Sequence, residues 1–285
     1  MNPWKPWFVF RPWQVVRRLT FRPTSAYRRL PVAWGEHLLT LDDEHIGRCL
    51  GTTGIYDLAV SELLFRLIEP GDLVVDAGAN IGYMSVLAAT AGAHVIAFEP
   101  NPALLPILRQ NLGTRGEVRP VALGARRHAA ALIPPDPAAH NNGLGRLGSD
   151  AEPGAVPVQV ETLDDELQNR SVAILKIDVE GAEHAVLEGA AKALRERRIR
   201  HIVFEDHHGA GSAVMTQLLD YRYTIYAVQW TLRGPKLGDA ATLPAHACYE
   251  APSYLATLTP DFARAACSKR GWMALRRRPS VAGSW

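Results

Sequence analysis

Asp76-Ala77-Gly78-Ala79-Asn80-Ile81-Gly82 is the stretch that decides the fold of this 285-residue chain. An apolar run at residues 73–75 precedes it, and small and apolar residues at 83–89 follow it. This pattern is typical of a buried strand, a glycine turn and a helix packed on a sheet. Gly78 and Gly82 lack a Cβ, so the backbone can adopt positive φ and approach a ligand, while the helix start offers unpaired N–H groups. The stretch therefore predicts a ligand-binding turn between a strand and a helix.

A second strand end follows about 20 residues downstream, the spacing of a carboxylate that binds ribose hydroxyls. The apolar run 94–98 leads there into Glu99-Pro100-Asn101-Pro102. The turn reads G-x-x-x-G after Asp76, not the G-x-G-x-x-G on which a pyrophosphate lies. An acid at the turn disfavours phosphate, so we expect S-adenosylmethionine, with its amino group, rather than NAD. The alternative is a tight strand–helix turn with a capping acid and no ligand.

The rest of the chain alternates between strand-like and helix-like segments. Helices are expected over residues 57–68, 104–112 and 182–195, and a further helix is expected to start at 162–165. Strands are expected over residues 118–123, 156–160, 172–177 and 202–204. Residues 133–154 have no clear period, and the aromatic region from Tyr221 is expected to finish the sheet as an antiparallel pair. This alternation predicts an α/β fold with a doubly wound, mostly parallel sheet.

Ligands of such sheets bind outside the carboxyl ends of the strands. That rule gathers polar and small residues around one opening: Asp76, Glu99, Ala122, Asp178 and Glu205. Asp178, Glu180 and Glu183 form an acidic segment after a buried strand. The alternative to a role in catalysis is helix capping, which an acid near a helix start performs without any ligand.

Four motifs together resemble one known family. They are residues 70–82, residues 97–102, Ala122-Leu123-Gly124, and Leu175-Lys176-Ile177-Asp178-Val179-Glu180-Gly181-Ala182-Glu183. Their order and spacing over residues 50–210 resemble the FkbM-type O-methyltransferases, which are class I S-adenosylmethionine-dependent enzymes. The resemblance implies a Rossmann-like, seven-stranded sheet and a hydroxyl acceptor on a glycan, glycolipid or secondary metabolite. It also implies that the donor is held by Asp76, Gly78, Asn80, Gly82, Glu99, Asn101 and Ala122, and that Asp178 faces both donor and acceptor.

Methyl transfer to a hydroxyl needs a general base or a metal that polarises the oxygen. Asp178, Glu205 and His207 are the candidate catalytic residues, and the same three side chains are the candidate ligands of one Mg²⁺. Residues 140–147 are expected to form a lid over the acceptor or a plain surface loop. Tyr56 and Asp57 are expected to close the donor site.

Charge is distributed unevenly along the chain. Residues 1–35 hold seven basic residues and residues 264–285 hold six, with no acid in either segment, so 18 basic residues face 29 acids in between. We expect a basic extension at 1–50, a methyltransferase domain at 51–250 and a basic tail at 251–285. The N-terminal arm, with Trp4, Trp7 and Trp13, is expected either to lie on anionic lipid at the inner membrane surface or to wrap an acidic body, its own or a second subunit's.

Cysteine content and motif chemistry narrow the remaining classes. Cys49, Cys248 and Cys267 form no C-x-x-C pair, which predicts neither a disulfide framework nor a zinc site and favours the cytoplasm. A nucleic-acid methyltransferase would explain the basic tails. It would, however, need an Asn/Asp-Pro-Pro-Tyr/Phe segment where Asp178-Val179-Glu180-Gly181 stands, or a nucleophilic cysteine after a proline. A scaffold that binds the donor without turnover is the other alternative.

Overall fold

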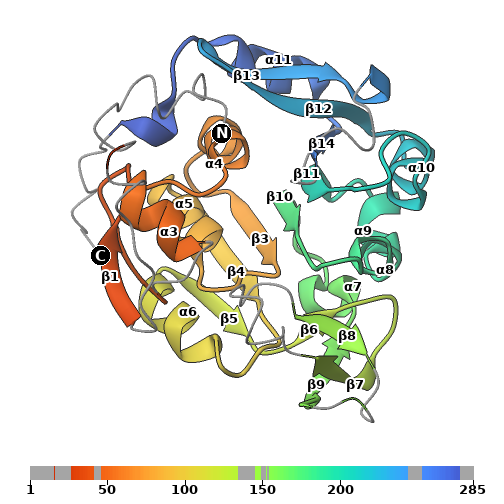
Figure 1. The fold of residues 1–285 in the computed structure, drawn as a ribbon. Coiled ribbons are helices and arrows are strands. Elements are labelled where there is room, and N and C mark those ends of the chain that lie inside the picture. Colours follow the sequence, from red (N-terminus) through yellow and green to blue (C-terminus); the bar gives the residue numbers. More distant parts are fainter. Residues whose placement is uncertain are drawn as a thin grey trace.

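The computed structural model describes residues 16, 27–41, 46–133, 145–148, 152, 154–242 and 252–276. Its centre is one large sheet with the strand order β13-β12-β14-β11-β10-β3-β4-β5 (Figure 1). The parallel strands are β3 (Leu73–Ala77), β4 (His94–Phe98), β5 (Gly116–Arg119), β10 (Val172–Ile177) and β11 (Ile199–Glu205). The antiparallel ones are β12 (Thr224–Thr231), β13 (Gly234–Asp239) and β14 (Ser253–Thr257).

This architecture confirms the predicted Rossmann-like α/β fold with a mostly parallel sheet. β3 pairs in parallel with both β4 and β10, so the strand order reverses around β3, as in a doubly wound sheet. The sheet has eight strands rather than seven, because the chain after β12 turns back at Gly234 and adds β13 as an antiparallel edge strand.

Helices cover both faces of the large sheet (Figure 1). One face carries α4 (Leu58–Leu67), α5 (Tyr83–Thr90) and α6 (Leu105–Leu112), and the other carries α7 (Leu163–Leu167), α8 (Glu183–Glu188), α9 (Ala191–Arg195) and α10 (Ala213–Asp220). Successive strand residues point to opposite faces, so Val74 packs in one buried cluster and Val75 in the other. The two clusters bury the two faces of the sheet and leave the carboxyl ends of its parallel strands available for a site.

A separate four-stranded sheet lies beside the large one. It has the order β6-β9-β7-β8 and consists of β6 (Ala122–Leu123), β7 (His128–Ile133), β8 (Arg146–Gly148) and β9 (Val156–Glu161). The single strand expected over 118–123 is therefore two strands in two sheets. Pro120, which has no N–H to donate, stands at the break. The strand expected over 156–160 is β9, and it lies in this smaller sheet.

The helix expected over 182–195 is also divided, into α8 and α9. Gly189 lies between them, and a Cβ at this position would be 2.0 Å from the carbonyl oxygen of Gly124. The close approach of β6 to the helix thus requires glycine at the point where the helical pattern is interrupted.

The chain ends of the described part pack onto the core. A hairpin of β1 (Tyr27–Pro31) and β2 (His37–Leu41) leads into α3 (Ile46–Thr52), and Trp34 in its turn is 1 % exposed. At the other end lie α11 (Pro260–Ser268) and the short helices η2 (Ala240–Thr242) and η3 (Met273–Leu275). Arg66 on α4 donates to the carbonyl oxygens of Ala266, Lys269 and Gly271 and so fixes this C-terminal segment.

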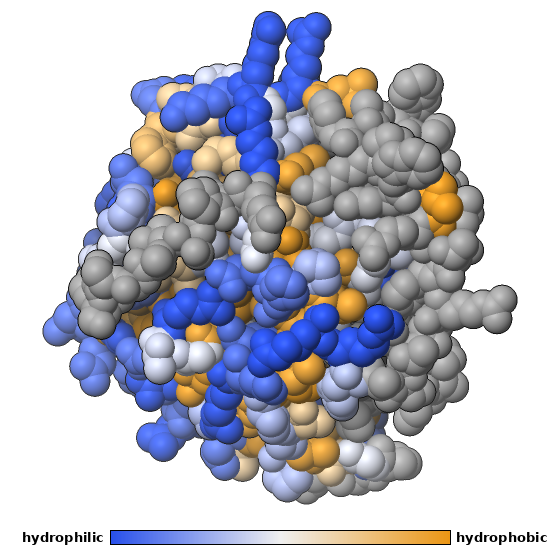
Figure 2. Space-filling model, turned by 90° about the vertical axis from the view of Figure 1, so that its left-hand side faces the viewer, coloured by the Kyte–Doolittle hydropathy of each residue, from blue (hydrophilic) through white to orange (hydrophobic). Residues whose placement is uncertain are grey.

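On the side of α3 and β1, hydrophilic and hydrophobic residues are interspersed on the visible surface (Figure 2). No helix in the described ranges has both the length and the apolar character needed to span a membrane. The expectations for the aromatic arm at residues 4–13, for Arg277 and Arg278 in the basic tail, and for residues 140–144 of the lid lie outside the described residues.

Candidate active site

A cavity opens at the carboxyl ends of the parallel strands. Its charged and polar lining residues are Tyr56, Asp57, Asn80, Glu99, Asn101, Lys176, Asp178, Glu180 and Glu205. We call the part around the glycine turn, Glu99 and Asn101 the donor half. The part around Tyr56, Asp57, Asp178, Glu180 and Glu205 is the acceptor half. The sequence predicted five residues around one opening. Glu99, Ala122, Asp178 and Glu205 line this cavity, and Asp76 does not.

The glycine turn has the expected backbone geometry. Gly78 and Gly82 have φ values of 76° and 86°, and Gly82 is the residue that precedes α5. A Cβ on Gly78 would be 1.9 Å from the carbonyl oxygen of Asp178, so no side chain fits there. Gly78 therefore lets the backbone of the donor half lie against the backbone of Asp178 in the acceptor half.

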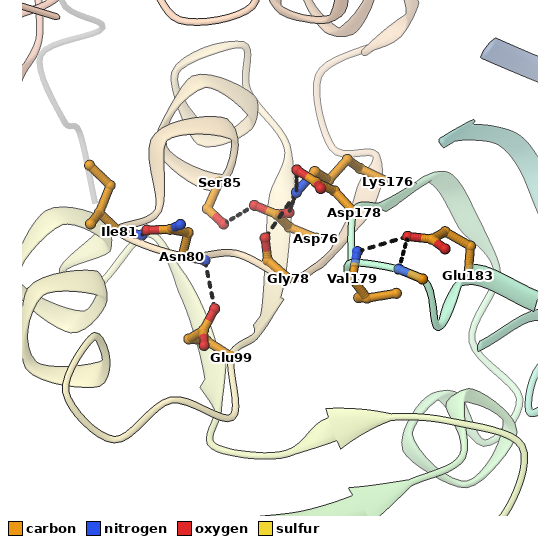
Figure 3. Close-up of polar contacts among 11 residues, drawn as sticks. Asp76, Gly78, Asn80, Ile81, Ser85, Glu99, Lys176, Asp178, Val179 and Glu183 are labelled. Carbon is orange, nitrogen blue, oxygen red and sulfur yellow. Dashed lines mark hydrogen bonds and ion pairs between the residues drawn. The ribbon is translucent and has the colours of Figure 1, made fainter. Parts of the chain in front are cut away.

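Glu99 is fixed by two backbone N–H groups. Asn80 N donates to Oε2 and Asn101 N donates to Oε1, each at 2.8 Å (Figure 3 shows the first bond). The side chain lines the cavity although the residue is only 6 % exposed, and burial raises its pKa against the opposing effect of these N–H donors. A carboxylate has about four lone-pair positions, so two acceptor positions stay available for ligand hydroxyls.

Asp76 has a different position from the one that its motif predicts. It is 1 % exposed and does not belong to the cavity lining. Its Oδ2 accepts a 2.6 Å hydrogen bond from Ser85 Oγ, and its Oδ1 lies 3.2 Å from Lys176 Nζ (Figure 3). Asp76 thus stabilises the turn from the protein interior through Ser85 and Lys176. Its contact with a donor amino group stays a prediction.

Lys176 joins the two halves of the cavity. Besides facing Asp76, its Nζ lies 3.3 Å from Asp178 Oδ2 and donates to the Gly78 carbonyl at 2.9 Å (Figure 3). Burial alone would lower the pKa of Lys176, but the Asp178 and Asp76 carboxylates raise it above its ordinary value. A permanent cation therefore holds the acceptor-side Asp178 and the glycine turn in one arrangement.

The acceptor half concentrates negative charge. Glu205 lies at the end of β11, and its side chain makes no hydrogen bond or ion pair with the described residues. Burial and the neighbouring Asp178 and Asp57 raise the pKa of Glu205 to about 8. Burial, Asp178 and Glu183 raise the pKa of Glu180 as well. The carboxylates of this half are close enough to oppose one another's ionisation.

Tyr56 forms a wall of the acceptor half. Its backbone N–H donates to the hydroxyl of Tyr83 at 3.1 Å, and its ring packs edge-on against the Tyr83 ring with centroids 5.8 Å apart. The Tyr56 hydroxyl itself has no hydrogen-bond partner among the described residues. Burial and the charges of Asp178, Asp57 and Glu205 raise the pKa of Tyr56, so its hydroxyl keeps its proton.

Asp57 begins α4 and lines the same wall. Its φ is 39°, and its Oδ1 accepts a 3.1 Å hydrogen bond from Val60 N as the cap of the helix. Tyr56 and Asp57 were expected to close the donor site. Here both residues line the cavity, and the charge of Asp57 raises the pKa of Glu205 in the acceptor half.

His207 lies outside the cavity lining, and its side chain is exposed. Its neighbour Asp206 accepts hydrogen bonds from Ser212 Oγ and from His208 N and closes the turn after β11. Among the residues that the structure describes, no three His, Cys, Asp or Glu side chains are grouped to hold a metal ion. Asp178, Glu205 and His207 are therefore not arranged as the expected Mg²⁺ ligands, since Asp178 faces Lys176 and His207 faces solvent.

The remaining expected residues also lie at the cavity. Asn101 accepts from Ala103 N at 3.0 Å, and Ala122 lines the cavity from β6. Residues 145–147 are the described part of the expected lid, and Gly145 and Leu147 of this part line the cavity as well. Sequence reasoning missed Lys176 and Ser85 as parts of the site. The available signal for Lys176 was a lone cation inside the buried run 172–177.

Comparisons with known proteins agree with this geometry. Residues 76–225, more than half of the chain, match the methyltransferase FkbM domain. The chain is 30% identical over 181 residues to the hexuronic acid methyltransferase AglP of Haloferax volcanii, covering 62% of this chain and 72% of that protein. It is 34% identical over 199 residues to the 31-O-demethyl-FK506 methyltransferase FkbM of Streptomyces tacrolimicus, covering 57% of this chain and 76% of that protein.

Solved structures with a similar arrangement include a TehB-like SAM-dependent methyltransferase from Corynebacterium glutamicum. It has a TM-score of 0.40 and 13% identity, with 74% of this chain and 92% of that chain covered. The precorrin-6y C5,15-methyltransferase from Geobacter metallireducens has a TM-score of 0.38 and 14% identity, with 70% and 85% covered. The sequence matches, rather than these structures, decide the family: the chain belongs to the FkbM family of S-adenosylmethionine-dependent methyltransferases.

Proposed function

We propose that this methyltransferase transfers a methyl group from S-adenosylmethionine to a hydroxyl of a glycan, glycolipid or secondary metabolite. The observation that carries the proposal is the single cavity that extends from the glycine turn and Glu99 to Asp178 and Glu205. One relative is named for a hexuronic acid and the other for the 31-O-demethyl form of FK506, and the second name specifies transfer to oxygen.

The donor half fits a nucleoside without a phosphate. Glu99, held by the N–H groups of Asn80 and Asn101, accepts hydrogen bonds from the two ribose hydroxyls. The apolar side chains of Ile81 and Leu104 line the same end of the cavity and suit the flat adenine ring. The bound donor would supply a methyl group activated by a sulfonium.

The acceptor half supplies the proton acceptor. Transfer to a hydroxyl would form a carbon–oxygen bond at the acceptor, break the carbon–sulfur bond of the donor with S-adenosylhomocysteine as the leaving group, and release the hydroxyl proton. Glu205 takes this proton, because it lines the cavity without a protein partner and its pKa of about 8 is near the operating pH. Asp178, held by Lys176, accepts a hydrogen bond from the acceptor and orients it. We assign no step to His207 or to a metal ion.

Calorimetric titration tests the donor half. We expect S-adenosylmethionine and S-adenosylhomocysteine to bind with micromolar affinity and NAD not to bind. Glu99→Ala leaves two partly buried N–H groups unpaired and removes the ribose contact, so it should weaken binding by about 10- to 100-fold. Glu117→Ala is the matched control, since Glu117 lies on the neighbouring strand β5 with its side chain 54 % exposed and outside the cavity. Equal loss in both variants, or binding of NAD, contradicts the proposal.

A second measurement separates an enzyme from a scaffold. Formation of S-adenosylhomocysteine and of an O-methyl product is followed by mass spectrometry with a panel of hexosides and hydroxylated metabolites. Glu205→Gln should lower the transfer rate by about 10²- to 10⁴-fold, the usual contribution of a general base, and leave donor affinity unchanged. Donor binding without transfer to any hydroxyl compound would favour the scaffold.

A further inference from the structure

The charged residues that line the cavity are strongly unequal in sign. Among the described residues, the carboxyl-bearing lining residues are Asp57, Glu99, Asp178, Glu180 and Glu205, and Lys176 is the one cation. All of the carboxyl groups except Glu99 belong to the acceptor half. The sign of this charge bears on what the acceptor half can accommodate.

Lys176 does not offset this charge for an incoming ligand. Its ammonium group lies 3.2 Å from Asp76 and 3.3 Å from Asp178 and donates to the Gly78 carbonyl, and its side chain is only 9 % exposed. The ammonium group thus forms one hydrogen bond and two ion pairs within the protein, which offset its charge. A carboxylate or phosphate on the acceptor would therefore meet no cation, among the described lining residues, that is not already paired with protein carboxylates.

The effect of these charges is visible on two neighbouring groups. Burial raises the pKa of the Glu205 carboxyl and of the Tyr56 hydroxyl, and the nearby Asp178 and Asp57 carboxylates raise both further. A negative group of a ligand placed between them would meet the same repulsion. A neutral hydroxyl or a protonated amine would not.

Two polar groups in the same half remain available for a ligand. The Tyr56 hydroxyl and the Glu205 carboxyl line the cavity, and neither has a hydrogen-bond partner among the described residues. Both side chains are half-buried and line the cavity, so a ligand that enters the acceptor half can form hydrogen bonds with them in place of water. Together they offer a donor and an acceptor, which is what a sugar hydroxyl pairs with.

We propose that the acceptor half selects a sugar-sized polyol with no anionic group beside the methylated hydroxyl and excludes carboxylated and phosphorylated equivalents. This inference rests on the proposed function and defines the charge class of its acceptor, which would differ from the hexuronic acid for which one relative is named. Asp57 and Glu180 are the residues that set this specificity. A protonated amine beside the hydroxyl is accepted, because it meets opposite charges.

Three methyl pyranosides with the same ring provide the test: methyl glucoside, methyl glucuronide and methyl glucosaminide. Binding to the full-length protein saturated with S-adenosylhomocysteine is measured by ligand-observed NMR, and transfer is measured with S-adenosylmethionine. At low salt we expect the glucuronide to bind and react at least about tenfold more weakly than the glucoside, and the glucosaminide at least as well as the glucoside. Raising the salt from about 0.02 M to 0.5 M should narrow the difference.

Variants locate the effect. Asp57→Asn keeps an N-cap that tolerates positive φ and removes one charge, so it should reduce the discrimination against the glucuronide about threefold or more. Glu188→Gln is the matched control, because Glu188 lies on α8 with its side chain 50 % exposed and outside the cavity lining, and it should leave the ratio unchanged.

The proposal is overturned if the glucuronide binds or reacts as well as the glucoside, if Asp57→Asn and Glu188→Gln change the ratio equally, or if no pyranoside gives a signal. Each of these results is distinct from failure of the proposed function. That failure would appear earlier, as absence of S-adenosylmethionine binding in the calorimetric titration.

Discussion

The donor half and the acceptor half of the cavity use the same residue type in opposite ways. Glu99 in the donor half accepts two backbone hydrogen bonds of 2.8 Å, and Asp76 below it is held by Ser85 and Lys176. Glu205 in the acceptor half has no such partner and has a pKa raised to about 8. The donor half is thus stabilised by its own bonds before any ligand binds. In the acceptor half, burial and neighbouring carboxylates oppose the ionisation of Glu205.

This difference indicates how stability and function are divided over the site. A carboxylate with satisfied hydrogen bonds contributes to the folded state, while buried like charges oppose it. Residues that violate local rules of stability are expected at functional sites. The contrast therefore predicts that mutations in the donor half lower stability and that mutations in the acceptor half lower transfer, with Lys176 between them.

Replacing Lys176 by Met should have the largest effect. The substitution leaves Asp76, which is 1 % exposed, as an uncompensated buried charge and frees the Gly78 carbonyl and Asp178. We expect a loss of about 3–5 kcal/mol in the free energy of unfolding, measured by urea denaturation, together with loss of donor binding. Lys236→Met on the exposed edge of β13 is the control and should change stability by no more than about 0.5 kcal/mol. A small effect at Lys176 would show that the two halves are not coupled through it.

Gly78→Ala should have the next largest effect, and Gly71→Ala is its matched control. Both residues have positive φ, 76° and 89°, so both variants strain the backbone by about 1–2 kcal/mol. A Cβ at Gly71 meets nothing within 4 Å, whereas a Cβ at Gly78 meets the Asp178 carbonyl at 1.9 Å. The extra overlap should raise the cost at Gly78 to at least about 3 kcal/mol and weaken donor binding. Urea denaturation and donor titration of both variants check this, and equal costs would contradict the close approach of the two halves.

Glu205→Gln should change stability in a pH-dependent way. The folded protein binds the Glu205 proton more tightly than the unfolded chain, because the pKa rises from 4.5 to about 8. The stabilisation from Glu205 is complete below pH 4.5 and is lost as the pH rises through 8. Gln never ionises, so the variant should equal wild type near pH 4 and be more stable by about 1–3 kcal/mol near pH 9. Chemical denaturation at both pH values measures this. A difference in the free energy of unfolding between variant and wild type that does not change with pH would show that the ionised Glu205 carboxylate is solvated.

The donor half could be predicted from the sequence because its chemistry is local. Gly78, Gly82 and Glu99 stand at fixed spacings after two apolar runs, and those spacings alone place them at adjacent strand ends. The role of Lys176 could not be predicted in this way. It follows from the register of β10 on β3, which pairs Lys176 with Asp76 across some hundred residues of sequence.

The topology beyond the parallel strands was also only partly predictable. The antiparallel end of the sheet was expected from the aromatic region after Tyr221, and β12 and β14 confirm it. The second sheet was not expected, because a run of apolar residues does not tell which sheet its strand joins. The break at Pro120 was readable, since proline cannot donate to a ladder, but the partner of Ala122–Leu123 depends on contacts with β9.

Tyr56→Phe should have the smallest effect on stability and gives the sharpest comparison between the halves. The variant removes a hydroxyl that has no hydrogen-bond partner among the described residues and keeps the ring that packs on Tyr83. We expect the free energy of unfolding to change by less than about 0.5 kcal/mol, and the KM for the acceptor to rise about 5- to 10-fold as the ligand loses one hydrogen bond. Ser61→Ala is the contrasting variant, because Ser61 Oγ donates to the Tyr56 carbonyl at 2.8 Å and contacts the Tyr83 hydroxyl, so it should lower stability by about 1 kcal/mol. If Tyr56→Phe destabilises the protein as much as Ser61→Ala, the Tyr56 hydroxyl stabilises the folded state. The acceptor half would then, like the donor half, be stabilised by its own hydrogen bonds before any ligand binds.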